Sequence, residues 1–247
     1  MHTSRRTFCA QAATLMLAPR ALLAQSTARP DVAAIDHDRI LKAANGYLSE
    51  KPAPITALPC PRSPGTVHDY YSEPDDKAGA FTEHRDALLR FSMCVPALTA
   101  AFVLTKDQRY AAQAVAHLGA WFVDPATSMT PALNYARTTP PAKTGTPEGL
   151  VEAVHLAEVA QSVAFLEHAD AMTAETLAGV KKWFAAYLDW LNSSLLAGLA
   201  RDRKDHNGAS WLLQAAACAH LNTADVAALL SLRQRYKSLD LRAEIMA

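Results

Sequence analysis

The chain has 247 residues, of which half are hydrophobic and 19% are charged, and its formal net charge is zero. A chain of this length and composition can bury a sizeable core, so we expect a soluble globular protein. Loss of the first 24 residues would remove three arginines and no acid. The remaining chain is slightly acidic, which excludes a general nucleic-acid-binding role because that role needs a basic surface.

The N-terminus has the pattern of an export signal. Arg5 and Arg6 form a twin-arginine motif, and a mostly apolar run follows from Phe8 to Leu23. The run is too short to span a membrane, and small residues follow it as they do at a cleavage site. We therefore predict a twin-arginine signal peptide over residues 1–24, a mature chain over 25–247 that is exported to the periplasm, and no membrane span.

Apolar residues recur at helical spacing through most of the mature chain, and no alternating strand pattern stands out. Two proline-rich stretches, 51–64 and 124–147, interrupt the helical pattern, and Pro96 is expected to kink or divide one helix. The pattern predicts an all-α fold of helical hairpins packed side by side. The predicted helices span residues 36–48, 81–104, 106–122, 150–166, 174–191, 209–221 and 224–239.

The helix predicted over 174–191 carries its largest side chains at helical spacing. These are Trp183, Phe184, Tyr187 and Leu188, and we expect all four to be buried between helices.

The cysteines give no sign of a metal site. Cys60, Cys94 and Cys218 remain after the signal peptide, and they are scattered along the chain without metal-ligand spacing. Cys94 and Cys218 lie in apolar helical stretches, where a thiol behaves as a small core residue. We predict neither a metal nor a cofactor.

The segment from Asp202 to Gln214 concentrates polar side chains just before an apolar helix. His206 and Asn207 precede the helix expected from Ala209, so the free N–H groups and positive dipole end of that helix lie beside them. Such a place suits an anion, for example a sugar carboxylate. A simple helix cap by Asp205 or Asn207 fits the same residues, and the two roles are compatible.

Four segments in chain order carry a family resemblance. They are HDYYSE (68–73), FTEHR (81–85), AWFVDPAT with MTPALNYA (120–136), and DHNGASWLLQ (205–214). Together they resemble the alginate lyase family of polysaccharide lyases, over a region from Asp36 to the C-terminus. The resemblance implies an incomplete (α/α) toroid, in which inner helices line a substrate cleft, and cofactor-independent β-elimination on an acidic polysaccharide.

Elimination at a uronate needs a base for the C5 proton, a group that neutralises the sugar carboxylate, and an acid for the leaving O4. Related members read Asn-Asn-His before the tryptophan, where this chain reads Asp-His-Asn. The resemblance implies that His206 is the base and Asn207 the neutralising group, and we expect Tyr70 to donate the proton. The residues expected to bind substrate are Asn134, Tyr135, His68, Tyr71, His84, Arg85 and Trp211.

Two departures from the family pattern keep other functions open. A stretch that members carry between the Ser-Glu motif and Phe81 is missing, and the chain stops at Ala247, before a further Arg or Tyr of the site. We therefore expect a domain that is truncated at its C-terminus. One alternative is a non-catalytic glycan-binding protein or a degenerate remnant of a lyase. The other is a glycoside hydrolase on the same fold, which would use two carboxylates such as Asp69 and Asp205.

Overall fold

The structure, a computed structural model, describes residues 31–76, 78–222 and 226–238. The predicted signal peptide and its cleavage site lie outside the described residues. The chain divides into two compact units at residues 37 and 38, and the following description concerns the second unit. Helix α2, Val32–Tyr47, begins in the first unit and ends in the second.

Helices are the main regular secondary structure in the described part of the chain, which confirms the predicted all-α class. No named strand occurs in the described ranges, and the one bridge there is an isolated contact between Tyr71 and Tyr135. The longer helices are α3 (Glu83–Thr105), α4 (Gln108–Phe122), α5 (Leu156–Leu166), α6 (Ala174–Ser193), α8 (His206–Asn222) and α9 (Val226–Ser238). The shorter ones are η1 (Ile55–Ala57), η2 (Pro147–Ala153) and α7 (Leu195–Arg201).

Several predictions about the extent and continuity of the helices differ from the structure. The helix expected over 150–166 is interrupted, since η2 is a 3₁₀ helix and α5 starts only at Leu156. Helix α8 begins at His206 rather than Ala209, because Asp205 accepts backbone hydrogen bonds at its start. Pro96 does not divide α3, because the helix runs on through it. A proline at this position cannot donate the backbone hydrogen bond of a helix interior.

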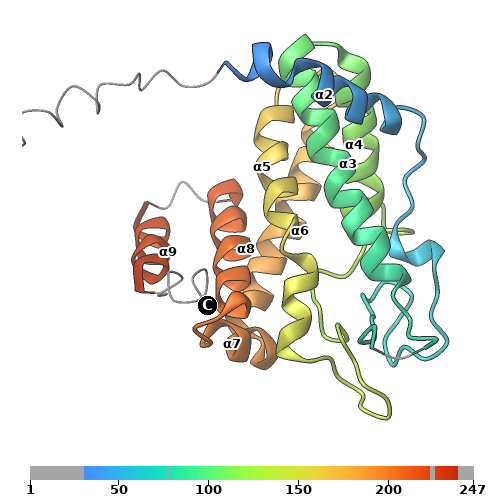
Figure 1. Ribbon diagram of the computed structural model, residues 1–247, viewed down its shortest axis with the longest axis vertical. Coiled ribbons are helices and arrows are strands. Elements are labelled where there is room, and N and C mark those ends of the chain that lie inside the picture. Colours follow the sequence, from blue (N-terminus) through green and yellow to red (C-terminus); the bar gives the residue numbers. More distant parts are fainter. Residues whose placement is uncertain (1–30, 77, 223–225, 239–247) are drawn as a thin grey trace, which may run out of the picture. The chain divides into compact units, whose positions relative to one another are not determined.

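The helices of the second unit form two layers. Helix α5 packs against both α3 and α8, and these three form one layer. Helix α4 packs on α3 and α6, and α6 packs on α8, so α4 and α6 form the layer behind (Figure 1). Helices α3, α5 and α8 all begin at the end drawn at the bottom of Figure 1, whereas α4 and α6 run the opposite way. This alternation is the expected packing of hairpins, and closure toward a toroid stays a prediction.

Aromatic side chains of α4 and α6 pack together in the core. Trp183 lies against the rings of Phe122, Phe184 and Tyr187, with ring centroids 4.2–5.3 Å apart. Trp183, Phe184 and Tyr187 are buried as predicted, whereas Leu188 is only half-buried. Cys94 and Cys218 are also buried, as predicted, and no group of potential metal ligands occurs among the described residues.

Two described stretches, Glu83–Thr105 and Pro147–Leu166, have the length and hydropathy of a membrane span. Half of the apolar window in each is buried inside the fold, where α3 and α5 pack on their neighbours. Core helices of globular proteins pass the same test of length and composition.

Candidate functional site

The beginning of α8 is held by Asp205. Its Oδ1 accepts the Asn207 backbone N–H at 2.8 Å and the Asn207 side-chain amide at 3.0 Å, so Asp205 caps the helix. Arg203 donates to Oδ2 of the same carboxylate at 2.9 Å and pairs with Glu148 of η2. The capping function therefore exists, and it belongs to Asp205.

His206 is exposed at the first position of α8. Within the part of the chain that the structure describes, no group hydrogen-bonds to its imidazole ring, so both ring nitrogens are open to a ligand. The backbone at Gly208 lies against the preceding turn, since a Cβ at this position would be 2.1 Å from the Arg203 carbonyl oxygen. The chain can turn tightly into α8 only with glycine at this position, and the turn leaves His206 on the outside.

Asn207 does not reach the surface. It is fully buried, its amide is bound to Asp205, and its Oδ1 has no hydrogen-bond partner in the described region. The structure therefore contradicts the prediction that Asn207 contacts a substrate carboxylate directly. The physical reason is the earlier start of α8, which turns this side chain inward beneath its cap.

A second part of the site is the loop from Asn134 to Thr138. Its backbone pairs with Ser72 on both sides, because Ser72 N–H donates to Tyr135 O at 3.2 Å and Thr138 N–H donates to Ser72 O at 2.8 Å. Arg137 has a φ of 54°, a left-handed conformation that non-glycine residues adopt rarely. Its N–H donates to the Ser72 hydroxyl at 2.8 Å, which helps to hold this conformation.

Three side chains of this loop remain open for binding. Asn134 is exposed, and its Oδ1 accepts from Trp190 Nε1 at 2.9 Å, so its amide N–H groups stay available. The Tyr135 hydroxyl has no partner among the described residues. No described carboxylate lies within ion-pair distance of the half-buried Arg137 guanidinium. The loop therefore presents a cation, an amide donor and a phenol close together in sequence.

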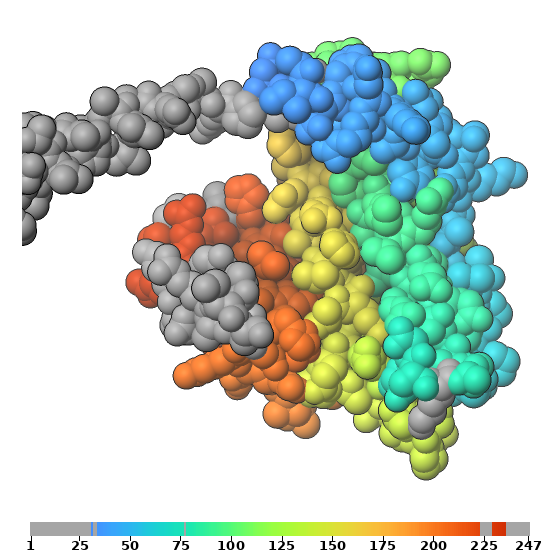
Figure 2. Space-filling view, viewed as in Figure 1, coloured from blue at the N-terminus to red at the C-terminus, as the bar shows by residue number. Residues whose placement is uncertain are grey.

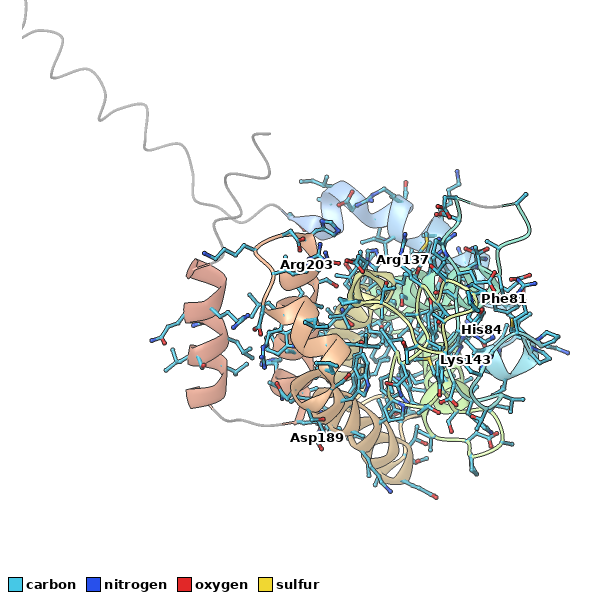
Figure 3. The ribbon with its side chains drawn as sticks, turned by 90° about the horizontal axis from the view of Figure 1, so that it is seen from below. Phe81, His84, Arg137, Lys143, Asp189 and Arg203 are labelled. Carbon is cyan, nitrogen blue, oxygen red and sulfur yellow. The ribbon has the colours of Figure 1, made fainter. Side chains whose placement is uncertain are left out.

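The two parts occupy the same end of the helices. Helix η2 packs against α8, and Gly149 of η2 is so close to Ala136 that a Cβ there would lie 2.5 Å from the alanine Cβ. Figure 3 looks at this end, with Arg137 and Arg203 toward one side of the view and Asp189 toward the other. In the space-filling view, the yellow-green residues around 140–150 lie at the bottom, below α3 and α5 (Figure 2).

Tyr70 cannot act as the proton donor to a substrate. It is fully buried, and its hydroxyl donates to Glu152 Oε2 at 2.9 Å. Burial and the neighbouring Glu152 carboxylate raise the pKa of Tyr70 well above its usual value. The structure therefore corrects the prediction that Tyr70 is the proton donor. Its ring is buried in the core, and its hydroxyl proton is hydrogen-bonded to Glu152.

Tyr71 and His84 are also core residues rather than substrate contacts. Tyr71 is buried and donates its hydroxyl to Glu73 at 2.6 Å. His84 is buried, accepts the Tyr71 N–H at 3.0 Å on Nδ1 and donates to Leu58 O at 2.7 Å from Nε2. Burial lowers the pKa of His84, which fits a neutral ring with both nitrogens in use.

Trp211 is the third predicted substrate-binding residue that the structure places in the core, after Tyr71 and His84. Its ring is 4% exposed, and its Nε1 donates to Leu191 O at 2.9 Å. The guanidinium groups of Arg201 and Arg235 lie over the ring at 6.0 and 5.4 Å from its centroid. The tryptophan therefore joins α8 to its neighbours.

Arg85 and His68 lie nearer to solvent. Arg85 is partly exposed but already pairs with Asp75 at 3.1 Å. His68 donates from Nδ1 to Ser128 O at 2.8 Å, which leaves Nε2 as an acceptor. The His68 ring lines a cavity of about 630 Å³ beside α6, together with Lys182 and Trp183. Both residues stay substrate-binding predictions.

Arg137 is a candidate binding residue that the sequence analysis did not identify. An arginine two positions after an Asn-Tyr pair carries no motif of its own. The structure shows its left-handed backbone, and no described carboxylate pairs with its guanidinium; neither feature can be read from the sequence.

Comparison with known proteins places the chain in a family. The sequence model of the alginate lyase family matches residues 25–247. No curated protein matches the sequence. The solved structure of an alginate lyase from Bacteroides ovatus is similar, with a TM-score of 0.76 and 24% sequence identity over 87% of this chain and 62% of that chain. The present chain thus spans less than two thirds of that protein, and the likeness shows the fold. On the match to its sequence model, the chain belongs to the alginate lyase family.

Proposed function

We propose that the chain is a polysaccharide lyase that cleaves a uronate-containing, alginate-like glycan by β-elimination. The observation that carries the proposal is Arg137, which has no ion-pair partner among the described residues and follows the available donor groups of Asn134 and Tyr135 in the same loop. A guanidinium that forms no ion pair with the described residues suits a sugar carboxylate, and family membership supplies the reaction class.

The reaction needs three roles, which the accessible residues can fill. Arg137, with the Asn134 amide, binds the uronate carboxylate and stabilises the negative charge that develops as the C5 proton leaves. His206 accepts that proton on a ring nitrogen. The Tyr135 hydroxyl protonates O4 as the glycosidic bond breaks, which leaves a double bond between C4 and C5. No cofactor enters this sequence of steps.

The two carboxylates that a hydrolase would use, those of Asp69 and Asp205, are both bound to neighbouring protein groups. Asp69 Oδ2 accepts the backbone N–H and the hydroxyl of Thr66 at 2.7 and 2.8 Å. Asp205 caps α8 and pairs with Arg203. A hydrolase needs one carboxyl group as an acid and another as a base or nucleophile. Engagement of both groups in local hydrogen bonds favours elimination over hydrolysis.

The proposed function is tested by incubating the purified mature chain with alginate and with other uronate polymers. Elimination gives an unsaturated uronate, whose ultraviolet absorbance grows with each bond cut. Binding without a rise in absorbance on every polymer would instead identify a non-catalytic glycan-binding protein.

His206→Ala is expected to lower turnover by about 100-fold, the usual scale for loss of a general base. The affinity for substrate should change much less, because proton transfer matters only as the transition state is reached. The matched control is His220→Ala, which removes an exposed histidine from the last turn of the same helix. Full turnover by a folded His206→Ala protein would contradict His206 as the base, and His68 would be the next histidine to test.

We also propose that the mature chain works in the periplasm, because a twin-arginine motif and an apolar run begin the sequence. Replacement of Arg5 and Arg6 by lysine is expected to leave the protein in the cytoplasm with its signal uncleaved. Cell fractionation followed by immunoblotting measures this. Normal delivery of the double variant to the periplasm would contradict twin-arginine export.

A further inference from the structure

Glu152 connects η2 to the loop that carries Arg137. Its Oε2 accepts the Ser72 hydroxyl at 2.5 Å and the Tyr70 hydroxyl at 2.9 Å. Ser72 and Tyr70 are both fully buried, so neither hydroxyl has water as an alternative partner. One carboxylate oxygen therefore fixes two side chains of the segment that runs beneath the site.

Ser72 links Glu152 to the backbone of Arg137 through two hydrogen bonds. The same Ser72 hydroxyl that donates to Glu152 accepts the Arg137 N–H at 2.8 Å. A serine hydroxyl can donate once and accept at the same time, so orientation of its proton toward Glu152 turns its lone pairs toward Arg137. The left-handed backbone of Arg137 is unfavourable without such support.

The Glu152 carboxylate is held by hydrogen bonds and not by an ion pair with the neighbouring arginines. Arg85 and Arg137 are near enough to favour its ionised form, but no ion pair joins either of them to Glu152 in the described residues. Burial outweighs these cations and raises the pKa of Glu152. The second oxygen, Oε1, is buried without a hydrogen-bond partner in the described region. Only Oε2 therefore makes hydrogen bonds, and they come from hydroxyl groups.

We infer that Glu152 is a positioning residue, which acts as a hydrogen-bond acceptor to hold Ser72 and, through it, the Arg137 backbone in the geometry that presents the guanidinium to substrate. The role of Arg137 toward substrate rests on the proposed lyase function. The positioning itself is a property of the protein without substrate, so it can be measured separately.

Amide hydrogen exchange of residues 134–138 is the direct measurement. Glu152→Ala is expected to speed exchange in this segment by at least about 10-fold, because a loop that loses its support opens more often. Glu152→Gln should keep the protection, since one amide oxygen can accept both hydroxyls where Oε2 now does. Glu167→Ala, at the far end of α5 in a surface pair with Lys181, is the matched control and should leave exchange unchanged.

The variants with faster amide exchange at residues 134–138 should also have a lower kcat. Displacement of a substrate-positioning group by about 1 Å costs on the order of 100-fold, so Glu152→Ala should lower kcat by about that factor with a smaller change in KM. Glu152→Gln should restore most of the activity. Ser72→Ala removes the hydroxyl that joins Glu152 to the Arg137 N–H, and it should reproduce the exchange result if Glu152→Ala does not fold.

Three outcomes would overturn the inference. The first is unchanged exchange in folded Glu152→Ala and Ser72→Ala proteins. The second is a Glu152→Gln protein that exchanges as fast as Glu152→Ala, because charge rather than hydrogen bonding would then hold the loop. The third is faster exchange at 134–138 with unaltered turnover in an active enzyme. An inactive wild-type chain whose exchange responds as expected would refute the lyase function while supporting the positioning.

Discussion

Arg137→Gly is expected to lower kcat/KM on a uronate polymer by about 100- to 1,000-fold, the scale for loss of one group that stabilises developing negative charge. Arg137 has no carboxylate partner among the described residues, so its charge is available to the substrate. Glycine is the informative substitution because it tolerates the left-handed backbone at φ 54°. The loss should therefore appear in turnover and not in stability.

Two further variants separate charge from backbone effects. Arg137→Lys keeps a positive charge but cannot form a bidentate contact, so it should recover part of the activity. Arg109→Ala removes an exposed arginine at the start of α4, where its partner is Asp107, and should leave turnover unchanged. Steady-state kinetics on the three proteins gives the comparison. A folded Arg137→Gly enzyme with normal kcat/KM would contradict the proposed binding of the carboxylate.

Trp183→Ala is expected to reduce the free energy of unfolding by about 3–5 kcal/mol, as for other large aromatic side chains removed from a core. Trp183 is 5% exposed, and three aromatic rings surround it. Its Nε1 also donates to Met129 O at 2.6 Å, which ties α6 to the loop after α4. The variant therefore loses both packing and the hydrogen bond that satisfies a buried carbonyl.

Denaturant unfolding followed by circular dichroism measures this effect. Phe165→Ala is the matched control, since Phe165 is 61% exposed on α5 and should change stability by less than about 0.5 kcal/mol. A Trp183→Ala protein as stable as the Phe165→Ala protein would mean that the aromatic cluster between α4 and α6 does not form as described.

The helices could be predicted from the sequence because burial of one helix face repeats along the chain. The helical spacing of apolar residues over 174–191 predicts that Trp183, Phe184 and Tyr187 are buried, and the structure confirms this. Such spacing did not reveal α7, whose seven residues are too few to show a period. It also missed the break between η2 and α5, because 3₁₀ and α turns share the same short-range apolar spacing.

The site could be located from the sequence more easily than its residues could be assigned. Polar residues before α8 and in the proline-bounded loop do lie at one end of the helices, but which of them face solvent depends on tertiary hydrogen bonds. Asn207 turns inward because Asp205 caps the helix, and Tyr70 turns inward because Glu152 accepts its proton. Neither Glu152 nor Arg137 belongs to a motif, so the roles proposed for them rest on the contacts of Ser72.

Elimination is tested most directly by the masses of the products released from a uronate polymer by the purified mature chain. We expect each newly formed non-reducing end to belong to an oligosaccharide one water lighter than its saturated counterpart, because the bond breaks by loss of a proton. Hydrolysis would add one water at every cut and give only saturated masses. Saturated products, or an intact polymer after incubation with the folded protein, would contradict a lyase.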